Sequence, residues 1–149
     1  MPKTIHLTNA SALIAVVLSC ASSRPAVTPP AGQPPAEALR QPPQALRFIE
    51  GRWESSDPSN AWQMTARWSE QAGRFEAVLT RNGQRSEAVG FTVGELVWKA
   101  TPQGEGAVRE EQLFRSAGGA QTWREGSVNL QESTPDRLVT TYSRFVRVP

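Results

Sequence analysis

The feature of this sequence that most constrains its fold is a repeated alternation of apolar and polar residues between short turn signals. Over 61–70 the apolar positions are Trp62, Met64, Ala66 and Trp68, with polar residues between them. Because successive side chains of a strand point to opposite faces, this period of two predicts a strand with one buried face. More short segments follow, without a helical pattern long enough for a crossover, which predicts an antiparallel meander.

About eight short strands are expected, with Gly, Pro, Asn or Asp at the turns between them. Their expected ranges are 51–55, 61–70, 74–81, 84–93, 96–101, 107–116, 120–131 and 138–148. Asn82-Gly83 is a pair typical of a two-residue hairpin turn. An all-β meander of this size either closes into a small barrel or packs as a two-sheet sandwich. The number of strands is compatible with both, and we expect the closed barrel.

The N-terminus has the parts of an export signal, with Lys3 near the start and an apolar stretch of about ten residues. A membrane span would need about 20 apolar residues. The stretch ends at Cys20, the only cysteine, and Val17-Leu18-Ser19-Cys20 resembles the bacterial lipobox. This resemblance implies that residues 1–19 are a lipoprotein signal peptide and that the Cys20 thiol carries a lipid. The alternative is an ordinary signal peptide cleaved near Ser22.

A lipid on Cys20 would hold the mature chain at a membrane of the bacterial cell envelope, through acyl chains such as palmitate. Ala21 is not the aspartate that retains enterobacterial lipoproteins at the inner membrane, so we expect the outer membrane, facing the periplasm. Residues 20–44 hold seven of the 12 prolines, which predicts a disordered, extended tether rather than a folded segment. Residues 45–149 are then one domain.

Composition excludes several functions for the mature chain. Loss of Lys3 brings the 16 basic residues close to the 14 acidic ones, and no basic stripe indicates a nucleic-acid partner. His6 is the only histidine and leaves with the signal, so no Ser-His or Cys-His dyad and no histidine metal ligand can form. The residues predict no cofactor and no metal.

Carboxylates on neighbouring expected strands are candidates for an acid/base pair. Glu110, Glu111 and Glu125 lie on two such strands, but adjacent residues point to opposite faces, so only one of the first two can join Glu125 in the interior. Nearby arginines can pair with them on the surface. A β-bulge near Gly126 or a partly polar interior would explain the charges on both faces. We expect no enzyme.

The start of the domain carries a resemblance to a known family. Leu46 and Ile49 are spaced for one helical turn that Gly51 can end, and Gly51-Arg52-Trp53 follows. This opening is similar to that of lipocalin-like (calycin-type) β-barrels, and the segment 87–104 resembles small bacterial lipocalin-like domains of uncharacterised function. The resemblance implies that Trp53 packs beneath the barrel against an arginine from near the last strand. Two arginines fit that place, Arg144 and Arg147. Haem-binding relatives of this barrel need a histidine, which the mature chain lacks.

Aromatic residues on the expected strands are the candidate ligand contacts. They are Trp62, Met64, Trp68, Phe75, Leu79 and Trp98. They either line a lumen for a small hydrophobic ligand or fill the core, because an eight-stranded barrel is about wide enough for side chains alone. Two functions follow. The first is a lipid-anchored protein that binds or carries a small apolar ligand, and the second is a non-catalytic module with a filled barrel that contacts an envelope protein.

Overall fold

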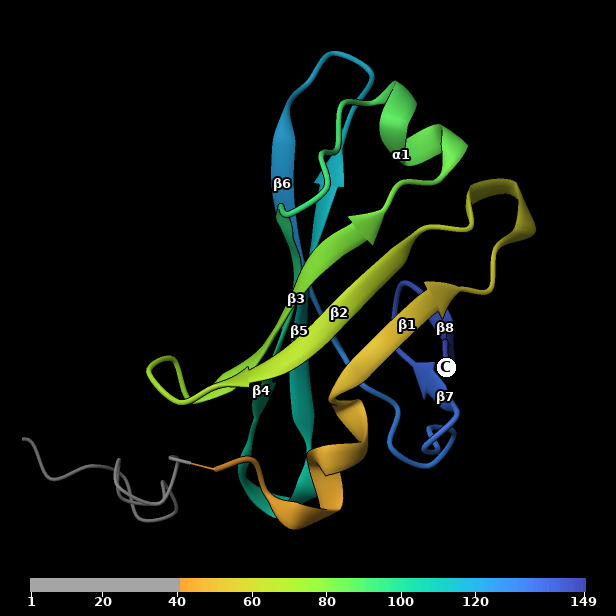
Figure 1. The fold of residues 1–149 in the computed structure, drawn as a ribbon. Helices are drawn as coiled ribbons and strands as arrows, with labels where there is room; N and C mark the ends of the chain where they lie inside the picture. Colours follow the sequence, from red (N-terminus) through yellow and green to blue (C-terminus); the bar gives the residue numbers. More distant parts are fainter. Residues whose placement is uncertain (1–40) are drawn as a thin grey trace, which may run out of the picture.

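The computed structural model describes residues 41–149, and the expected signal peptide, Cys20 and most of the expected tether lie outside them. The described residues form one antiparallel eight-stranded sheet that curls strongly into a half-barrel (Figure 1). The strands are β1 (Gly51–Ser55), β2 (Gln63–Ser69), β3 (Arg74–Arg81), β4 (Leu96–Pro102), β5 (Val108–Arg115), β6 (Gln121–Ser127), β7 (Arg137–Val139) and β8 (Arg144–Arg147). Their order across the sheet is β6-β5-β4-β3-β2-β1-β8-β7, so the all-β meander is confirmed.

The two edge strands of the sheet, β6 and β7, meet just beyond their ends. Val128 pairs with Thr140 in one isolated antiparallel bridge. Beside it, the N–H of Thr141 donates to the carbonyl of Ser127 at 3.0 Å. The strands therefore form a single curled sheet whose edges meet only over residues 127–129 and 139–141, and not the two packed sheets of a sandwich.

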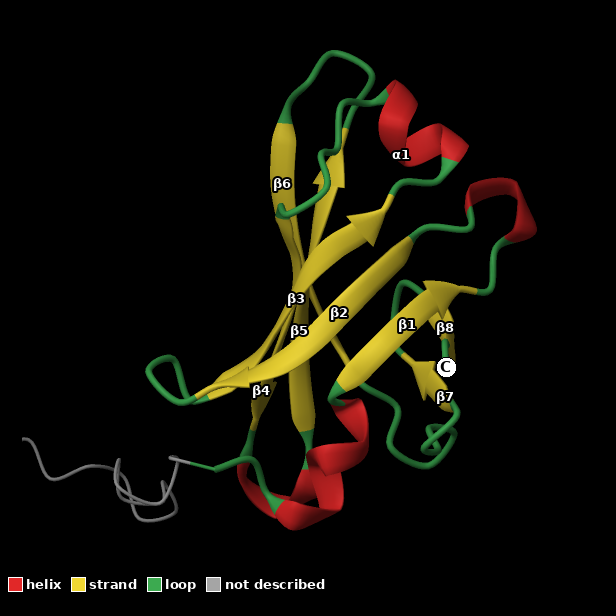
Figure 2. Ribbon diagram, viewed as in Figure 1, coloured by secondary structure: helices red, strands yellow, loops and turns green. Residues whose placement is uncertain are grey.

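Short helices lie at the two ends of the half-barrel. The 3₁₀-helix η2 (Gln44–Ile49) precedes β1 at one end, and η3 (Pro58–Asn60) and α1 (Gln84–Ala88) lie at the other (Figure 2). A further 3₁₀ turn, η4 (Gly104–Gly106), joins β4 to β5. Between the ends, the inward faces of the strands form the core. Its largest fully buried side chains are Trp53, Trp98, Phe75, Phe145, Ile49, Met64, Leu79 and Leu138.

Trp53 and Arg147 join the first strand to the last at the η2 end. The Trp53 indole N–H donates to the carbonyl of Ile49 at 2.8 Å, which fixes η2 over the core. The guanidinium carbon of Arg147 lies 4.3 Å from the centre of the Trp53 ring, a cation–π contact. Of the two arginines weighed from the sequence, Arg147 is the one over Trp53, and Arg144 lies beside a cavity at the opposite end.

Arg147 also satisfies backbone carbonyls at this end of the sheet. Its guanidinium donates to the carbonyls of Glu50, at 3.0 Å, Phe48 and Pro135. These include carbonyls at the end of η2, which have no partner within so short a helix. Gly51 has φ 138°, and a Cβ there would collide with the Arg147 guanidinium. Glycine is therefore required at residue 51 by both its backbone and its neighbour.

The expected strand over 84–93 is wrong, and so is the hairpin turn at Asn82-Gly83. Residues 84–88 form helix α1, and the remainder is a loop (Figure 2). Gln, Arg, Glu and Ala in this stretch favour a helix, and Asn60 accepts a hydrogen bond from the Ser86 N–H at 3.1 Å at its start. Gly83 has φ −92°, outside the left-handed region, and a Cβ there would collide with Asn60.

The expected single strand over 138–148 is also wrong, because it divides into β7 and β8. The Thr140 hydroxyl accepts hydrogen bonds from the N–H groups of Tyr142 and Ser143, at 3.3 and 3.1 Å. Such side-chain bonds to the backbone compete with strand pairing and favour a turn. The expected total of eight strands is right only because two errors cancel. Residues 84–93 contain no strand, and residues 138–148 contain two strands instead of one.

Gly51→Ala is expected to destabilise the fold by about 2–4 kcal/mol, because a positive φ and a steric clash with Arg147 act together. The matched control is Gly118→Ala, where the nearest atom to a Cβ would be 3.8 Å away. Urea unfolding measures both. Equal stabilities of the two variants would contradict this account of the η2 end.

Candidate ligand-binding cavity

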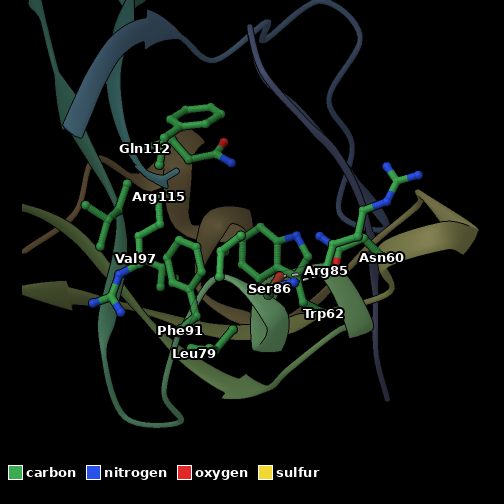
Figure 3. Close-up of a pocket in the computed structure, with 12 residues that line it drawn as sticks. Asn60, Trp62, Leu79, Arg85, Ser86, Phe91, Val97, Gln112 and Arg115 are labelled. Carbon is green, nitrogen blue, oxygen red and sulfur yellow. Dashed lines mark hydrogen bonds between the residues drawn. The ribbon is translucent and has the colours of Figure 1, made fainter. Parts of the chain in front are cut away.

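A cavity of about 240 Å³ lies inside the half-barrel beneath α1, at the end opposite η2 (Figure 3). Its apolar lining comes from the residue before β2, from β3, β4 and β5, and from the α1 loop, as Trp62, Leu79, Val89, Phe91, Val97, Leu113 and Phe114. Its polar lining is Asn60, Arg85, Ser86, Gln112 and Arg115. The apolar majority suits the non-polar part of a small molecule.

A second, wider cavity of about 770 Å³ opens beside the first, between η3 and the β7–β8 turn. Its lining is mainly polar and includes Ser55, Asp57, Asn129, Thr140, Ser143 and Arg144. The two cavities share four lining residues, which are Asn60, Trp62, Gln112 and Phe114. Together they form a small apolar chamber with a broad polar mouth. We call these four side chains the junction.

Two of the six candidate ligand contacts reach this chamber. Trp62 and Leu79 line it. The other four, Met64, Trp68, Phe75 and Trp98, line neither cavity and belong to the packed part of the interior. There the rings of Trp68 and Phe75 meet edge to face, with centroids 4.9 Å apart. Most of the six side chains therefore fill the core, whereas Trp62 and Leu79 border open space.

The loop that covers the chamber is held by specific hydrogen bonds. Asn60 accepts from the Ser86 N–H and hydroxyl, at 3.1 and 3.2 Å, and so ties α1 to η3. Asn82 donates to the carbonyl of Phe91 at 2.8 Å. Arg115 of β5 pairs with Glu95 and also donates to the loop carbonyl of Gly90. Hydrogen bonds to η3 on one side and to β5 on the other thus hold the α1 loop in place, and the chamber is preformed.

Glu110 is a fully buried acid in the packed half of the interior. Its Oε2 accepts a hydrogen bond from the Trp98 indole at 2.9 Å, and its Oε1 has no hydrogen-bond partner among the described residues. Burial raises the pKa of Glu110, and the polar groups near the carboxyl, first the Trp98 indole N–H and then the Thr140 hydroxyl and the backbone N–H groups of Tyr142 and Thr141, only partly oppose that rise. The carboxyl is therefore stabilised in its neutral form.

Glu110 faces Gly126 of β6, where a Cβ would lie 2.9 Å from Oε1. The β5–β6 pairing shows no shift of register, so there is no bulge at Gly126. On β5 the inward Glu110 makes the interior partly polar, and on the edge strand β6 both Arg124 and Glu125 are exposed. Glu125 points outward, with 69% of its side chain exposed, and lies 4.0 Å from Arg109. Glu110 and Glu125 therefore do not face each other.

Sequence reasoning missed Asn60, Gln112 and the α1 loop as parts of a site. The loop was interpreted as a strand, which removed the cover of the chamber. Gln112 lies two residues after Glu110 on β5, which puts it on the same inward face. Asn60 lies in a turn, and only the folded contact with α1 gives it a role.

None of the helices in residues 41–149 has the length and apolar character of a membrane span. Comparison with protein-family models, curated proteins and solved structures finds no match to this chain.

Glu110→Gln is expected to change how stability depends on pH. Because the folded pKa is raised, the folded state binds the proton more tightly than the unfolded chain, and wild-type stability falls as pH rises through that pKa. The variant lacks this loss, so its unfolding free energy relative to wild type should increase from pH 4 to pH 8. Glu125→Gln, at an exposed site on the paired strand, is the matched control. Parallel stability curves for wild type and Glu110→Gln, measured by urea unfolding, would contradict the buried acid.

Proposed function

We propose that this chain is a lipid-anchored cell-envelope protein whose half-barrel binds a small ligand with an apolar part. The observation that carries the proposal is the preformed chamber beneath α1, with its apolar lining and polar mouth. Ligand sites in proteins are typically concave and mostly apolar, with a few polar groups that fix orientation. In the same proposal, the β6–β7 bridge completes a functional barrel around the chamber.

The lipocalin-like resemblance belongs to this proposal too. Arg147 over Trp53 beneath the sheet is the arrangement that the resemblance implies, and the strand order agrees with a meander. Both observations support a lipocalin-like architecture for residues 45–149. The shortness of the domain is consistent with a chamber at one end only.

The size of the chamber limits the ligand. A group the size of a water molecule occupies about 30 Å³ in a liquid, so 240 Å³ holds on the order of eight non-hydrogen atoms. A 16-carbon chain such as palmitate would not fit inside it. Small acyl or similar groups fit, whereas a long lipid would have to leave half its length in the polar mouth.

The second function, contact with an envelope protein through a filled barrel, has less support. It would be favoured by a closed interior and an exposed aromatic patch around Trp123. Trp123 is instead half-buried, with the Lys99 ammonium 3.8 Å from its ring centre. The exposed large apolar residues are Val78, Val93, Tyr142 and Val146. They lie on different strands and loops, and the chamber is the more specific feature.

Val97→Phe tests the chamber directly, because Val97 lines it and is 2% exposed. The added ring is expected to enter the cavity and abolish retention of a bound compound, at a cost in stability of no more than about 1–3 kcal/mol. Native mass spectrometry of the full chain carrying Cys20→Ser, after incubation with envelope lipid extract, measures retention. Val93→Phe, 63% exposed and outside the lining, is the matched control. An apo mass for wild type and both variants would reject the binding function.

The anchor has a separate test. Cys20→Ser is expected to abolish incorporation of labelled palmitate and to release the protein from membranes, because no thiol is left for acylation. Membrane fractionation and palmitate labelling measure this, and Ser23→Ala serves as a neighbouring control. A Cys20→Ser protein that still labels and sediments with membranes would reject the lipobox interpretation.

A further inference from the structure

The junction between the two cavities carries nitrogen donors that are not used inside the protein. Gln112 is 8% exposed, and its Oε1 accepts a hydrogen bond from the Ser143 hydroxyl at 3.1 Å. Its amide nitrogen has no acceptor among residues 41–149. This nitrogen is not among the fully buried side-chain atoms that lack a partner, and Gln112 lines both cavities, so a ligand or solvent in the cavity can accept its hydrogen bond.

Two further side chains of the junction also carry an N–H donor that has no acceptor among the described residues. The carbonyl oxygen of Asn60 accepts from Ser86, while its amide nitrogen donates to no described residue. The Trp62 indole N–H likewise has no described acceptor, although its ring is 8% exposed and packs against Phe145, with centroids 5.3 Å apart. In Figure 3 the Trp62 indole lies between Gln112 and Asn60.

The charged side chains that line the small chamber also favour an oxygen acceptor. Both of its charged lining residues are arginines, Arg85 and Arg115. Arg115 is paired with Glu95, and Arg85, which is 70% exposed at the rim, is paired more loosely with Asp57, at 3.9 Å. The junction therefore offers the N–H groups of Asn60, Trp62 and Gln112, with Arg85 in the lining beside it, and N–H donors of this kind bind oxygen acceptors.

We infer that the ligand is a short-chain molecule with an oxygen-acceptor head, a carboxylate or ester carbonyl, seated at Asn60, Trp62 and Gln112 with its chain in the chamber. This inference rests on the proposed binding function and specifies the ligand class for that site. Each methylene that enters the chamber should strengthen binding about four-fold. The gain should end at about eight carbons, where the 240 Å³ are filled.

The test is calorimetric titration of the full chain carrying Cys20→Ser with octanoate, and with carboxylates of four to 16 carbons. Octylammonium has the same chain and a head without an acceptor, and methyl octanoate distinguishes an ester from a carboxylate. Gln112→Leu removes the amide at similar size and should weaken octanoate binding about ten-fold. Gln103→Leu, at an exposed site away from both cavities, is the matched control.

Octanoate binding that exceeds octylammonium binding at least ten-fold, and that Gln112→Leu weakens while Gln103→Leu does not, would support the inference. Equal binding of octanoate and octylammonium, or no effect of Gln112→Leu on octanoate, would overturn the head group and leave the binding function standing. Affinity that rises steadily to 16 carbons would overturn the length limit. If no probe of any length or head group binds, the proposed function fails together with this inference. Circular dichroism of Gln112→Leu, with Asn60→Asp as a second variant that keeps the helix-capping oxygen, separates lost binding from lost folding.

Discussion

The contact between Arg147 and Trp53 is the interaction on which the rest of this structure depends. It joins the last strand to the first, and it also fixes η2 through carbonyls near the end of that helix. A cation on an aromatic face contributes about 0.5–2 kcal/mol, with the larger value where water is excluded. Because one side chain binds η2, β1 and the segment before β7, it fixes this end of the sheet where β1 and β8 pair.

This closed end explains why the interior is divided. The bulky side chains nearer η2, including Trp98 and Phe75, are fully buried and leave the free volume to the opposite end. The polar groups on the inward face of β5 follow the same division. Glu110 lies in the packed part and is bonded to Trp98, whereas Gln112, two residues further along, borders open space. One strand therefore supplies both a buried acid and a candidate ligand contact.

Much of the sheet could be predicted from the sequence, because alternation over 61–70 and 74–81 reports burial directly. Prediction failed where side-chain hydrogen bonds, which leave no periodic pattern in the sequence, decided the local structure. Residues 84–93 were assigned to a strand, although Gln84–Ala88 favours a helix whose start is satisfied by Asn60, 26 residues from Ser86. The Thr140 hydroxyl formed a turn inside an apparently continuous strand. Contacts between distant residues set both outcomes.

The site was less predictable than the fold for the same reason. The pattern of apolar residues along the strands indicated that Trp62 and Leu79 face inward. It could not distinguish these cavity residues from the core residues Met64 and Trp98, because free volume depends on how all strands pack. The junction depends on Asn60, which a sequence shows only as a turn residue. The choice of Arg147 over Arg144 was likewise made by register, since Arg147 stands opposite Trp53 in the β1–β8 pairing.

The most direct measurement is an NMR titration of the ¹⁵N-labelled protein with octanoate, followed on the indole N–H signals of its five tryptophans. The account predicts a large shift for Trp62, whose N–H has no acceptor in the described residues, together with the Gln112 side-chain amide. Trp53 and Trp98 should not move, because their indoles already donate to Ile49 and Glu110 in the packed half. A titration that leaves Trp62 unchanged, or that shifts Trp53 and Trp98 instead, would contradict a ligand site at the α1 end.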